Sequence, residues 1–326
     1  MSNYHIYTNR KRKQTPENNE KTRKKQRLDA PTPIAEKIYT LRHYVPKTGL
    51  LNEFKLDFGA LSSVQSSLDS LYRTSRWGKE GDCAISKTEL KHASSMHCSL
   101  LFGEILPAGV ERLCDPDLLD IGCARRVLDM GSGLGKLAVQ LFFSKPHIEL
   151  VWGIEFSPSR YAMCYEVLRE LCVSNPHRLT FKEMYGRSAG FQVTEHLPQQ
   201  KQKQKRRLRF FCGDMLSSHF QKLALQQHFD VIICETEVPQ TRFVTFLRCF
   251  KRLVDQPTTR SVLTYHDLDK VQHNNNNAAD DEDVDIAFRY LKRCYPDQEQ
   301  KRMIKTSWTT SGNSIGHVFH IWSSQR

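Results

Sequence analysis

The stretch from Val127 to Gln140 constrains the fold of this chain more than any other part of its sequence. It reads VLDMGSGLGKLAVQ: two apolar residues, an acid, three glycines at alternate positions and an amphipathic segment. Leu137, Ala138 and Leu141 then recur at helical spacing. Glycine adopts backbone angles that other residues resist and lets a ligand lie against bare backbone. The stretch therefore predicts a strand, a tight turn and a helix, the first unit of a nucleotide-cofactor fold.

The glycine spacing and the preceding acid distinguish between cofactors. Gly131, Gly133 and Gly135 run G-x-G-x-G, whereas the dinucleotide fingerprint runs G-x-G-x-x-G. Asp129 stands before them and is expected to face the ammonium group of a methionine moiety. The pattern favours S-adenosylmethionine (SAM) over NAD as the cofactor. An ordinary glycine-rich turn between strand and helix is the alternative interpretation.

Two later acids fall where contacts to a nucleoside are expected. The apolar run 148–155 predicts a second strand that ends on Glu155, where a carboxylate can accept both ribose hydroxyls. A third strand at 208–212 leads to Asp214 and Met215, which are expected at the adenine amino group and over its ring. The alternatives are an exposed strand-end acid for Glu155 and a helix cap for Asp214.

Four further runs complete the predicted sheet. Apolar runs at 229–234 and 261–266 predict a fourth and a fifth strand. Segments 303–308 and 317–322 alternate in the manner of two antiparallel strands. The sequence thus predicts an α/β fold of the class I methyltransferase type: a Rossmann-like, seven-stranded, mostly parallel sheet with helices on both faces.

The end of the predicted fourth strand carries two carboxylates. The run 229–234 is followed by Glu235, Thr236 and Glu237. In folds of this type the strand end faces the reactive part of the ligand. We therefore expect Glu235 to bind a cationic amine or to accept its proton. Tyr265, after the fifth strand, is expected to line the same channel, because an aromatic wall suits a cation.

The net charge of +12 is concentrated in two segments. Residues 1–30 hold nine Lys/Arg and three acids, and residues 199–209 hold six Lys/Arg and no acid. With almost no apolar content, residues 1–30 predict a disordered tail. Its basic clusters between residues 10 and 27 are typical of a bipartite nuclear import signal, and equally of an arm for nucleic acid phosphates. A merely solvated tail is the third interpretation; the first predicts a nuclear protein.

The remaining sequence predicts two further regions. Residues 31–120 favour a mainly helical amino-terminal subdomain that ends in a loop covering the cofactor. Residues 121–326 form the predicted SAM-binding domain, with low-complexity insertions near 195–207 and 273–283.

Other function classes receive no support from the sequence. No apolar run approaches the roughly twenty residues of a spanning helix, so we expect no membrane contact. The ten cysteines form no CxxC pair, so we expect reduced core residues and no metal site. The oligomeric state cannot be read from the sequence.

The motif residues resemble those of one methyltransferase family. Over about residues 95–270 the chain is similar to the disruptor-of-telomeric-silencing histone lysine methyltransferases, which lack a SET domain. The resemblance is carried by residues 129–135 (DMGSGLG), by Gln140 at the family's glutamine position and by residues 102–104 (FGE), which look like the family's Tyr-Gly-Glu loop.

The resemblance implies roles for individual residues. Gln140 and Glu104 join the cofactor-binding set, with Glu104 and Asp129 at the methionine end. Phe102 is expected beside the channel. At residues 235–237, where the family has an asparagine-rich motif, this chain has Glu-Thr-Glu.

The resemblance also implies a histone lysine N-methyltransferase that acts on nucleosomes. A neutral lysine amine would displace the methyl group of SAM in line, with the enzyme supplying alignment. The basic segments 10–27 and 201–209 would bind the negatively charged nucleosome. They suit an RNA or DNA methyltransferase equally, although the Asn/Asp-Pro-Pro-Tyr/Phe and Cys-Pro patterns of base methylation are absent. A SAM-binding scaffold without catalysis is the third alternative.

Overall fold

The computed structural model describes most of the chain after residue 60. The described residues are 61–73, 85–101, 103–185, 189–196, 205–268, 288, 290–307 and 316–325. The predicted basic tail, the side chain of Phe102, residues 201–204 and the predicted insertion at 273–283 lie outside them. None of the described helices is long and apolar enough to cross a membrane.

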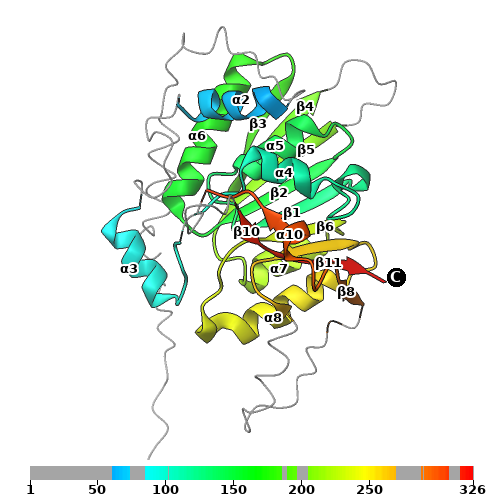
Figure 1. Cartoon of the computed structure of the whole chain (residues 1–326). Helices are drawn as coiled ribbons and strands as arrows, with labels where there is room; N and C mark the ends of the chain where they lie inside the picture. The colour runs from blue at the N-terminus through cyan, green and yellow to red at the C-terminus, as the bar shows by residue number, and fades with distance from the viewer. Residues whose placement is uncertain are drawn as a thin grey trace, which may run out of the picture.

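A nine-stranded sheet forms the centre of the molecule (Figure 1). Strands β5, β2, β1, β6 and β7 are parallel, and β11 pairs antiparallel with β7. In spatial order the strands are β3 (Leu179–Met184), β4 (Gly190–His196), β5 (Lys205–Cys212), β2 (Leu150–Glu155), β1 (Arg126–Met130), β6 (Val231–Cys234), β7 (Ser261–Thr264), β11 (His320–Ser324) and β8 (Leu291–Arg293).

The seven strands from β5 to β8 confirm the predicted fold class. If these seven strands are numbered by their order in the chain, their order across the sheet is 3-2-1-4-5-7-6. Only strand 7, which is β11, is antiparallel to the others. This is the sheet of the class I methyltransferase fold. The extra two strands, β3 and β4, form an antiparallel hairpin that extends the sheet beyond β5.

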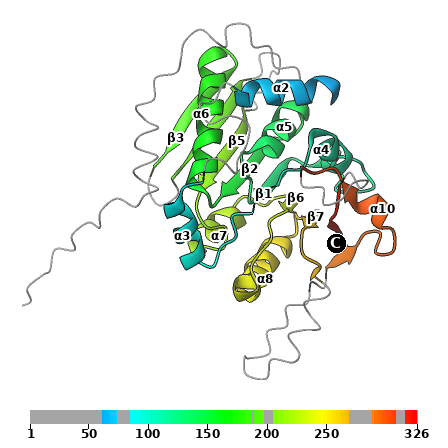
Figure 2. The same ribbon diagram turned by 60° about the vertical axis from the view of Figure 1, so that its left-hand side comes forward.

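Helices cover both faces of the sheet, as Figure 2 shows. Helices α5 (Lys136–Ser144) and α6 (Pro158–Ser174) share one core with the Val127 side of β1. Helices α7 (Ser218–Leu225) and α8 (Gln240–Val254) share the other with the Leu128 side. Because the central strands are buried on both faces, they read as continuous apolar runs, which is why the sequence predicted them well.

In the described part of the chain, three α-helices precede the first strand: α2 (Leu61–Arg73), α3 (Lys87–Ser95) and α4 (Pro107–Leu113). The described part of the predicted amino-terminal subdomain is thus helical. Helix α2 packs on α4, α5 and α6, and the Tyr72 hydroxyl donates to the Leu134 carbonyl at 2.6 Å. Apolar residues of α2 and α4 belong to the same core as α5, so these helices are continuous with the sheet.

The predicted insertion near 195–207 and the segment before it contain regular structure. They contain the hairpin β3–β4, and residues 205–207, assigned to the basic insertion, begin β5. Arg206 is buried there and its guanidinium pairs with the Glu195 carboxylate. The low-complexity composition concealed the start of β5, because a buried ion pair replaces an apolar residue there.

The carboxyl-terminal strands follow the prediction only in part. Strand β9 (Met303–Ile304) pairs antiparallel with β10 (His317–Val318), as expected, but the two form a small separate sheet. In the main sheet β11 lies between β7 and β8, and β8 is a short polar strand that precedes α10 (Glu299–Arg302) and that the sequence did not indicate.

Candidate functional site

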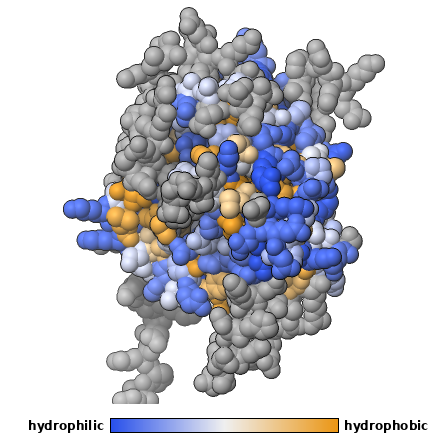
Figure 3. All heavy atoms as spheres, viewed as in Figure 1, coloured by the Kyte–Doolittle hydropathy of each residue, from blue (hydrophilic) through white to orange (hydrophobic). Residues whose placement is uncertain are grey.

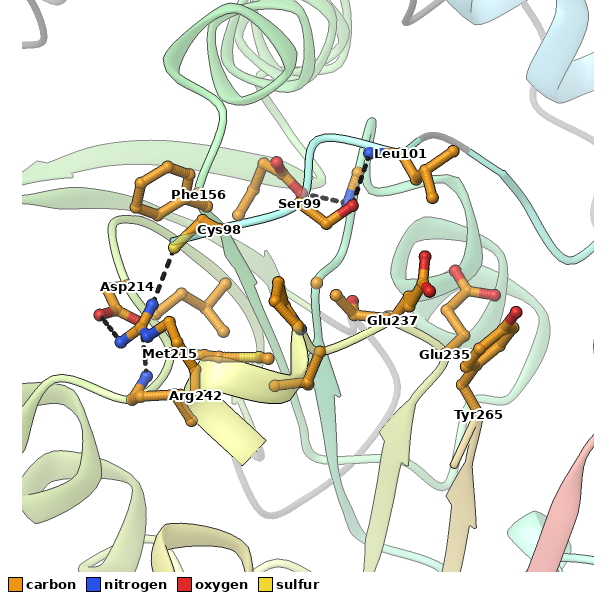
Figure 4. Close-up of a pocket in the computed structure, with 18 of the residues that line it drawn as sticks. Cys98, Ser99, Leu101, Phe156, Asp214, Met215, Glu235, Glu237, Arg242 and Tyr265 are labelled. Carbon is orange, nitrogen blue, oxygen red and sulfur yellow. Dashed lines mark hydrogen bonds and ion pairs between the residues drawn. The ribbon is translucent and has the colours of Figure 1, made fainter. Parts of the chain in front are cut away.

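A cavity of about 360 Å³ opens at the carboxyl ends of β1, β2, β5 and β6 (Figure 4). In open α/β sheets this edge is where ligands bind. Its lining comes from the turn after β1, the ends of the neighbouring strands and the segment 97–101 that follows α3. Gly131, Gly133, Glu155, Asp214, Met215, Glu235 and Tyr265, all predicted site residues, are brought together there.

The glycine turn is held tightly against its neighbours. The backbone N–H groups of Gly131 and Ser132 both donate to the Ile154 carbonyl at 2.9 Å. Gly131 has φ +88°, and a Cβ on it would lie 1.6 Å from the Thr236 Oγ1 atom. Gly135 does not line the cavity; with φ +79° it caps α5 and packs on Phe210. The turn thus needs glycine for two different reasons.

Glu155 is buried at the end of β2, which excludes the exposed strand-end alternative. Its carboxylate accepts from the Gly133 N–H at 2.8 Å and from the Ser157 N–H at 2.7 Å. Burial raises the pKa of this carboxyl, while the Arg160 guanidinium and the two N–H groups act against the rise. The side chain is therefore fixed in place with lone pairs left for a ligand hydroxyl.

Asp214 and Met215 lie at one end of the cavity, which we call the Asp214 end together with Phe156 and Arg242 (Figure 4). The Asp214 carboxylate accepts from the Leu216 N–H at 2.9 Å and from the Arg242 guanidinium at 2.6 Å. The residue that caps α7 is Ser217, so Asp214 is not the cap of that helix. All charged groups at this end have partners.

The opposite end is lined by Glu235 and Glu237. The predicted ligands Asp129 and Glu104 do not line the cavity, but their carboxyls lie close enough to Glu235 to raise its pKa, and we call the four acids together the Glu235 end. Neither oxygen of the buried Asp129 carboxyl has a hydrogen-bond partner, and burial, followed by the Glu155 carboxyl, raises its pKa to about 8. Glu104 pairs through Oε2 with Lys136 Nζ at 2.7 Å, but its shielded Oε1 atom has no partner. Burial raises the pKa of Glu104, against the effect of Lys136.

Glu235 extends this acidic cluster into the cavity. Its Oε2 atom is shielded from solvent and has no partner. Burial raises its pKa well above the usual range, and the carboxyls of Asp129 and Glu104 raise it further. The turn that carries it is fixed by the Thr236 hydroxyl, which donates to the Met130 carbonyl at 3.1 Å.

Glu237 and Tyr265 accompany Glu235 at the mouth of this end (Figure 4). Glu237 is exposed. The Tyr265 ring stacks on His317 with ring centroids 5.0 Å apart, so the aromatic wall is held from behind. The predicted channel residues Glu235 and Tyr265 thus lie together, while Phe102, predicted beside them, is outside the described residues.

Gln140 lies away from the cavity, contrary to the cofactor contact that the resemblance implied. It is buried, and its Nε2 donates to the Pro107 carbonyl at 3.1 Å and to Glu111 Oε1 at 3.4 Å. The side chain therefore fastens α4 to α5. Gln140 lies about one helical turn beyond the glycine motif. Its side chain is on the face of α5 that packs on α4, away from the strand ends.

Helix α3 and the segment after it close over the cavity. The Glu89 carboxylate accepts from both hydroxyls of Ser157 and Ser159 at the start of α6, and His92 stacks on Phe156. Residues 97–101 then line the cavity, apart from Leu100, whose carbonyl accepts from Arg160 at 2.6 Å. On the face seen in Figure 3 an apolar area lies around this helix, where Leu90, Met96 and Leu101 are exposed.

Several of these residues were missed by sequence reasoning. Lys136 directly follows the glycine motif, and a lysine next to a predicted site that contains Asp129 and Glu104 could have been predicted to pair with one of these acids. Arg242 and the segment 97–101 gave none, because they reach the cavity only through the packing of α3 and α8.

The charges of the Glu235 end restrict what the cavity can bind. Unpaired carboxylates in a low-dielectric site are stabilised by cations and repel phosphates. Within the described residues no cluster of His, Cys, Asp and Glu is arranged to hold a metal ion. The Glu235 end therefore fits a ligand group that carries positive charge.

No protein-family model matches the chain, and no curated protein matches it in sequence. Its fold is similar to that of solved structures described as Trm1 from Pyrococcus horikoshii with S-adenosyl-L-methionine (18% identity, TM-score 0.30), the methyltransferase domain of bacterial CtHen1 (13%, 0.32) and cofactor-bound Rv0187 from MTB (15%, 0.35). The matches cover 48%, 62% and 80% of this chain. They cover 35%, 90% and 98% of those chains, so the chain matches about a third of the length of Trm1. At these TM-scores the similarity assigns no function, and the fold class rests on the strand order.

Proposed function

We propose that this chain is a SAM-dependent methyltransferase. The observation that carries the proposal is the set of buried carboxylate oxygens without partners on Asp129, Glu104 and Glu235, at the carboxyl edge of the sheet. NAD and nucleotides would bring phosphates to this edge, and their negative charge would oppose ionisation of these carboxyls further. SAM carries an ammonium and a sulfonium instead, so it supplies the charge that these groups lack.

The residues present fit this cofactor along its length. Asp214 would accept from the adenine amino group with Met215 over the ring, and Glu155 would hold the ribose hydroxyls. Asp129 and the free Oε1 of Glu104 would bind the methionine ammonium. Lys136 would place a positive charge toward the methionine carboxylate. When bound, SAM supplies a methyl group on a positively charged sulfur.

The acceptor that suits the Glu235 end is an amine. Glu237, exposed at the mouth, would attract the protonated amine, and Tyr265 would give it an aromatic wall. The positive charge of bound SAM would favour the ionised form of Glu235, which would then take the proton at its unpartnered Oε2. A neutral amine is left aligned for transfer.

For the acceptor itself we propose a histone lysine on the nucleosome, with the protein in the nucleus. The proposal is supported by the resemblance at residues 129–135 and by the basic segments 10–27 and 201–209. The acidic acceptor end adds support, since it favours a lysine ammonium over the uncharged amino group of a base.

Two measurements test the proposal. Calorimetry should detect SAM binding to the full chain, with Asp129→Asn weakening it. The protein is then incubated with methyl-labelled SAM and, separately, nucleosomes, free histones and RNA. Label on nucleosomal histone is expected, and label on RNA alone would contradict the lysine assignment. SAM binding without label on any acceptor would leave a cofactor-binding scaffold, and absence of SAM binding would overturn the proposal as a whole.

A further inference from the structure

Arg242 joins three segments that are far apart in the sequence. It lies in the first turn of α8 and lines the cavity. One guanidinium nitrogen donates to Asp214 Oδ2 at 2.6 Å, and another donates to Cys98 Sγ at 2.8 Å. Figure 4 shows this chain of contacts across the Asp214 end. The side chain thus connects the end of β5 with the segment that follows α3.

The contact with Asp214 fixes how that carboxylate is presented. Its Oδ1 atom already accepts from the Leu216 N–H, so Arg242 on Oδ2 leaves the carboxylate no freedom to rotate. An ionised carboxylate has about four acceptor sites, so lone pairs remain for an amino group in the cavity. Both side chains are mostly shielded, which makes a charge-assisted hydrogen bond stronger than at an exposed surface.

The contact with Cys98 fixes the covering segment. His97, Cys98, Ser99 and Leu101 line the cavity from the side opposite the sheet. Burial raises the pKa of the Cys98 thiol, so sulfur is a neutral, weak acceptor for the guanidinium. This contact is therefore the weaker of the two that Arg242 makes.

We propose that Arg242 is a positioning residue that couples adenine recognition to closure of residues 97–101 over the cofactor. The inference rests on the proposed function, because it assigns the Asp214 end to adenine. One planar side chain orients the acceptor for the adenine amino group and holds the cover in place. A lysine would keep the charge but lacks the fork that reaches both partners.

The test compares ligands that share the adenosine part. SAM and methylthioadenosine, which lacks the amino acid, are titrated into the full chain carrying Arg242→Ala, Arg242→Lys, Cys98→Ala or the control Arg248→Ala. Arg248 is an exposed arginine on the same helix. Arg242→Ala should weaken both ligands by the same factor, about ten- to a hundredfold, with Arg242→Lys between it and the wild type. Arg248→Ala should bind as the wild type does.

The covering segment is followed separately. Cys98→Ala should speed SAM dissociation about two- to tenfold in stopped flow. It should also raise hydrogen exchange in a peptide spanning 97–101, while a peptide from β1 stays unchanged. Unaltered binding of both ligands to Arg242→Ala would overturn the inference, and so would a loss for SAM alone, because that places the effect at the methionine end. If the wild type binds neither ligand, the proposed function fails, whatever the variants do.

Discussion

The charged groups at the Asp214 end of the cavity all have partners, whereas acids at the Glu235 end keep oxygens without partners. At the Asp214 end the carboxylate is held by Arg242 and by the Leu216 N–H, so its geometry is complete before a ligand arrives. At the Glu235 end, Asp129, Glu104 and Glu235 each keep shielded oxygens without partners. Burying such groups disfavours the folded state unless something neutralises them. The comparison indicates that one end is built for recognition and the other for a cation that the ligands bring.

The glycine turn between the two ends should give the largest effect. Gly131→Ala places a Cβ 1.6 Å from Thr236 Oγ1 at φ +88°, so the turn must move and both ends lose their alignment. Strain of about 3 kcal/mol corresponds to a loss of SAM affinity of about a hundredfold or more. Calorimetry measures this loss.

Two further variants show whether the loss comes from the turn. Gly122→Ala is the matched control, since a Cβ there meets only Asp120 Oδ1 at 4.0 Å, and it should bind normally. Gly131→Ala with Thr236→Ala removes the 1.6 Å clash with Oγ1 but leaves the residue 236 Cβ at 3.0 Å and the backbone strain, so it should recover part of the affinity. Wild-type affinity in Gly131→Ala would show that the turn does not support the cofactor.

Glu235→Gln separates binding from transfer. The amide is similar in size but cannot take a proton, so kcat should fall about a hundredfold, while SAM affinity should change less than in Asp129→Asn, because Glu235 is assigned to the acceptor amine. Single-turnover methylation of the acceptor, with calorimetry alongside, measures the two effects. Glu237→Gln is the control, because that carboxylate is exposed and should affect mainly KM. A kcat unchanged in Glu235→Gln would place the proton acceptor elsewhere.

The pH dependence of stability tests the unpaired state of Asp129 directly. Its folded pKa, about 8, lies above the ordinary value of 3.8, so the unfolded chain releases this proton first as pH rises. The folded protein therefore loses stability between about pH 4 and pH 8, and the loss is complete above pH 8. Asp129→Asn should raise Tm by at least about 2 °C at pH 8.5 and leave it unchanged at pH 4.

The control for this prediction is a substitution at Asp214. Asp214→Asn removes a paired carboxylate and should lower Tm at pH 8.5, whereas Asp129→Asn should raise it. Thermal unfolding followed by circular dichroism across this pH range gives both results. A Tm of Asp129→Asn below that of the wild type at pH 8.5 would mean that Asp129 is paired in solution.

The sequence predicted the parts of the fold that depend on local pattern. Strand 231–234 is apolar throughout, and strand 127–130 is apolar apart from Asp129, because both their faces are buried, and glycines mark the turn where the backbone needs them. The sequence did not predict the hairpin β3–β4 or β8, a polar strand at the edge of the sheet. Strand β5 was predicted from residue 208 only, because a buried ion pair replaces an apolar residue at Arg206 near its start.

The site was predictable wherever a strand end fixes the side chain. Glu155, Asp214 and Glu235 follow strands and reach the cavity because parallel strands end at the same edge. Arg242 and residues 97–101 could not be predicted, since their place depends on how α8 and α3 pack across about 140 residues of chain. Burial state and pairing of the acids were likewise beyond sequence pattern, because both depend on neighbours from other elements.

A substitution at Gln140 should have the smallest effect on binding. It should lower the stability of the fold and leave SAM affinity almost unchanged. Gln140→Met keeps the volume and loses the hydrogen bonds to Pro107 and Glu111, so the free energy of unfolding should fall by about 1 kcal/mol. SAM affinity should stay within about twofold, because the side chain faces α4 and not the cavity. A twofold change in Kd is about 0.4 kcal/mol, less than the expected loss of stability. Urea unfolding and calorimetry on the same preparation measure both. A tenfold loss of affinity at unchanged stability would return Gln140 to the cofactor site and would require α4 to be repositioned when the cofactor binds.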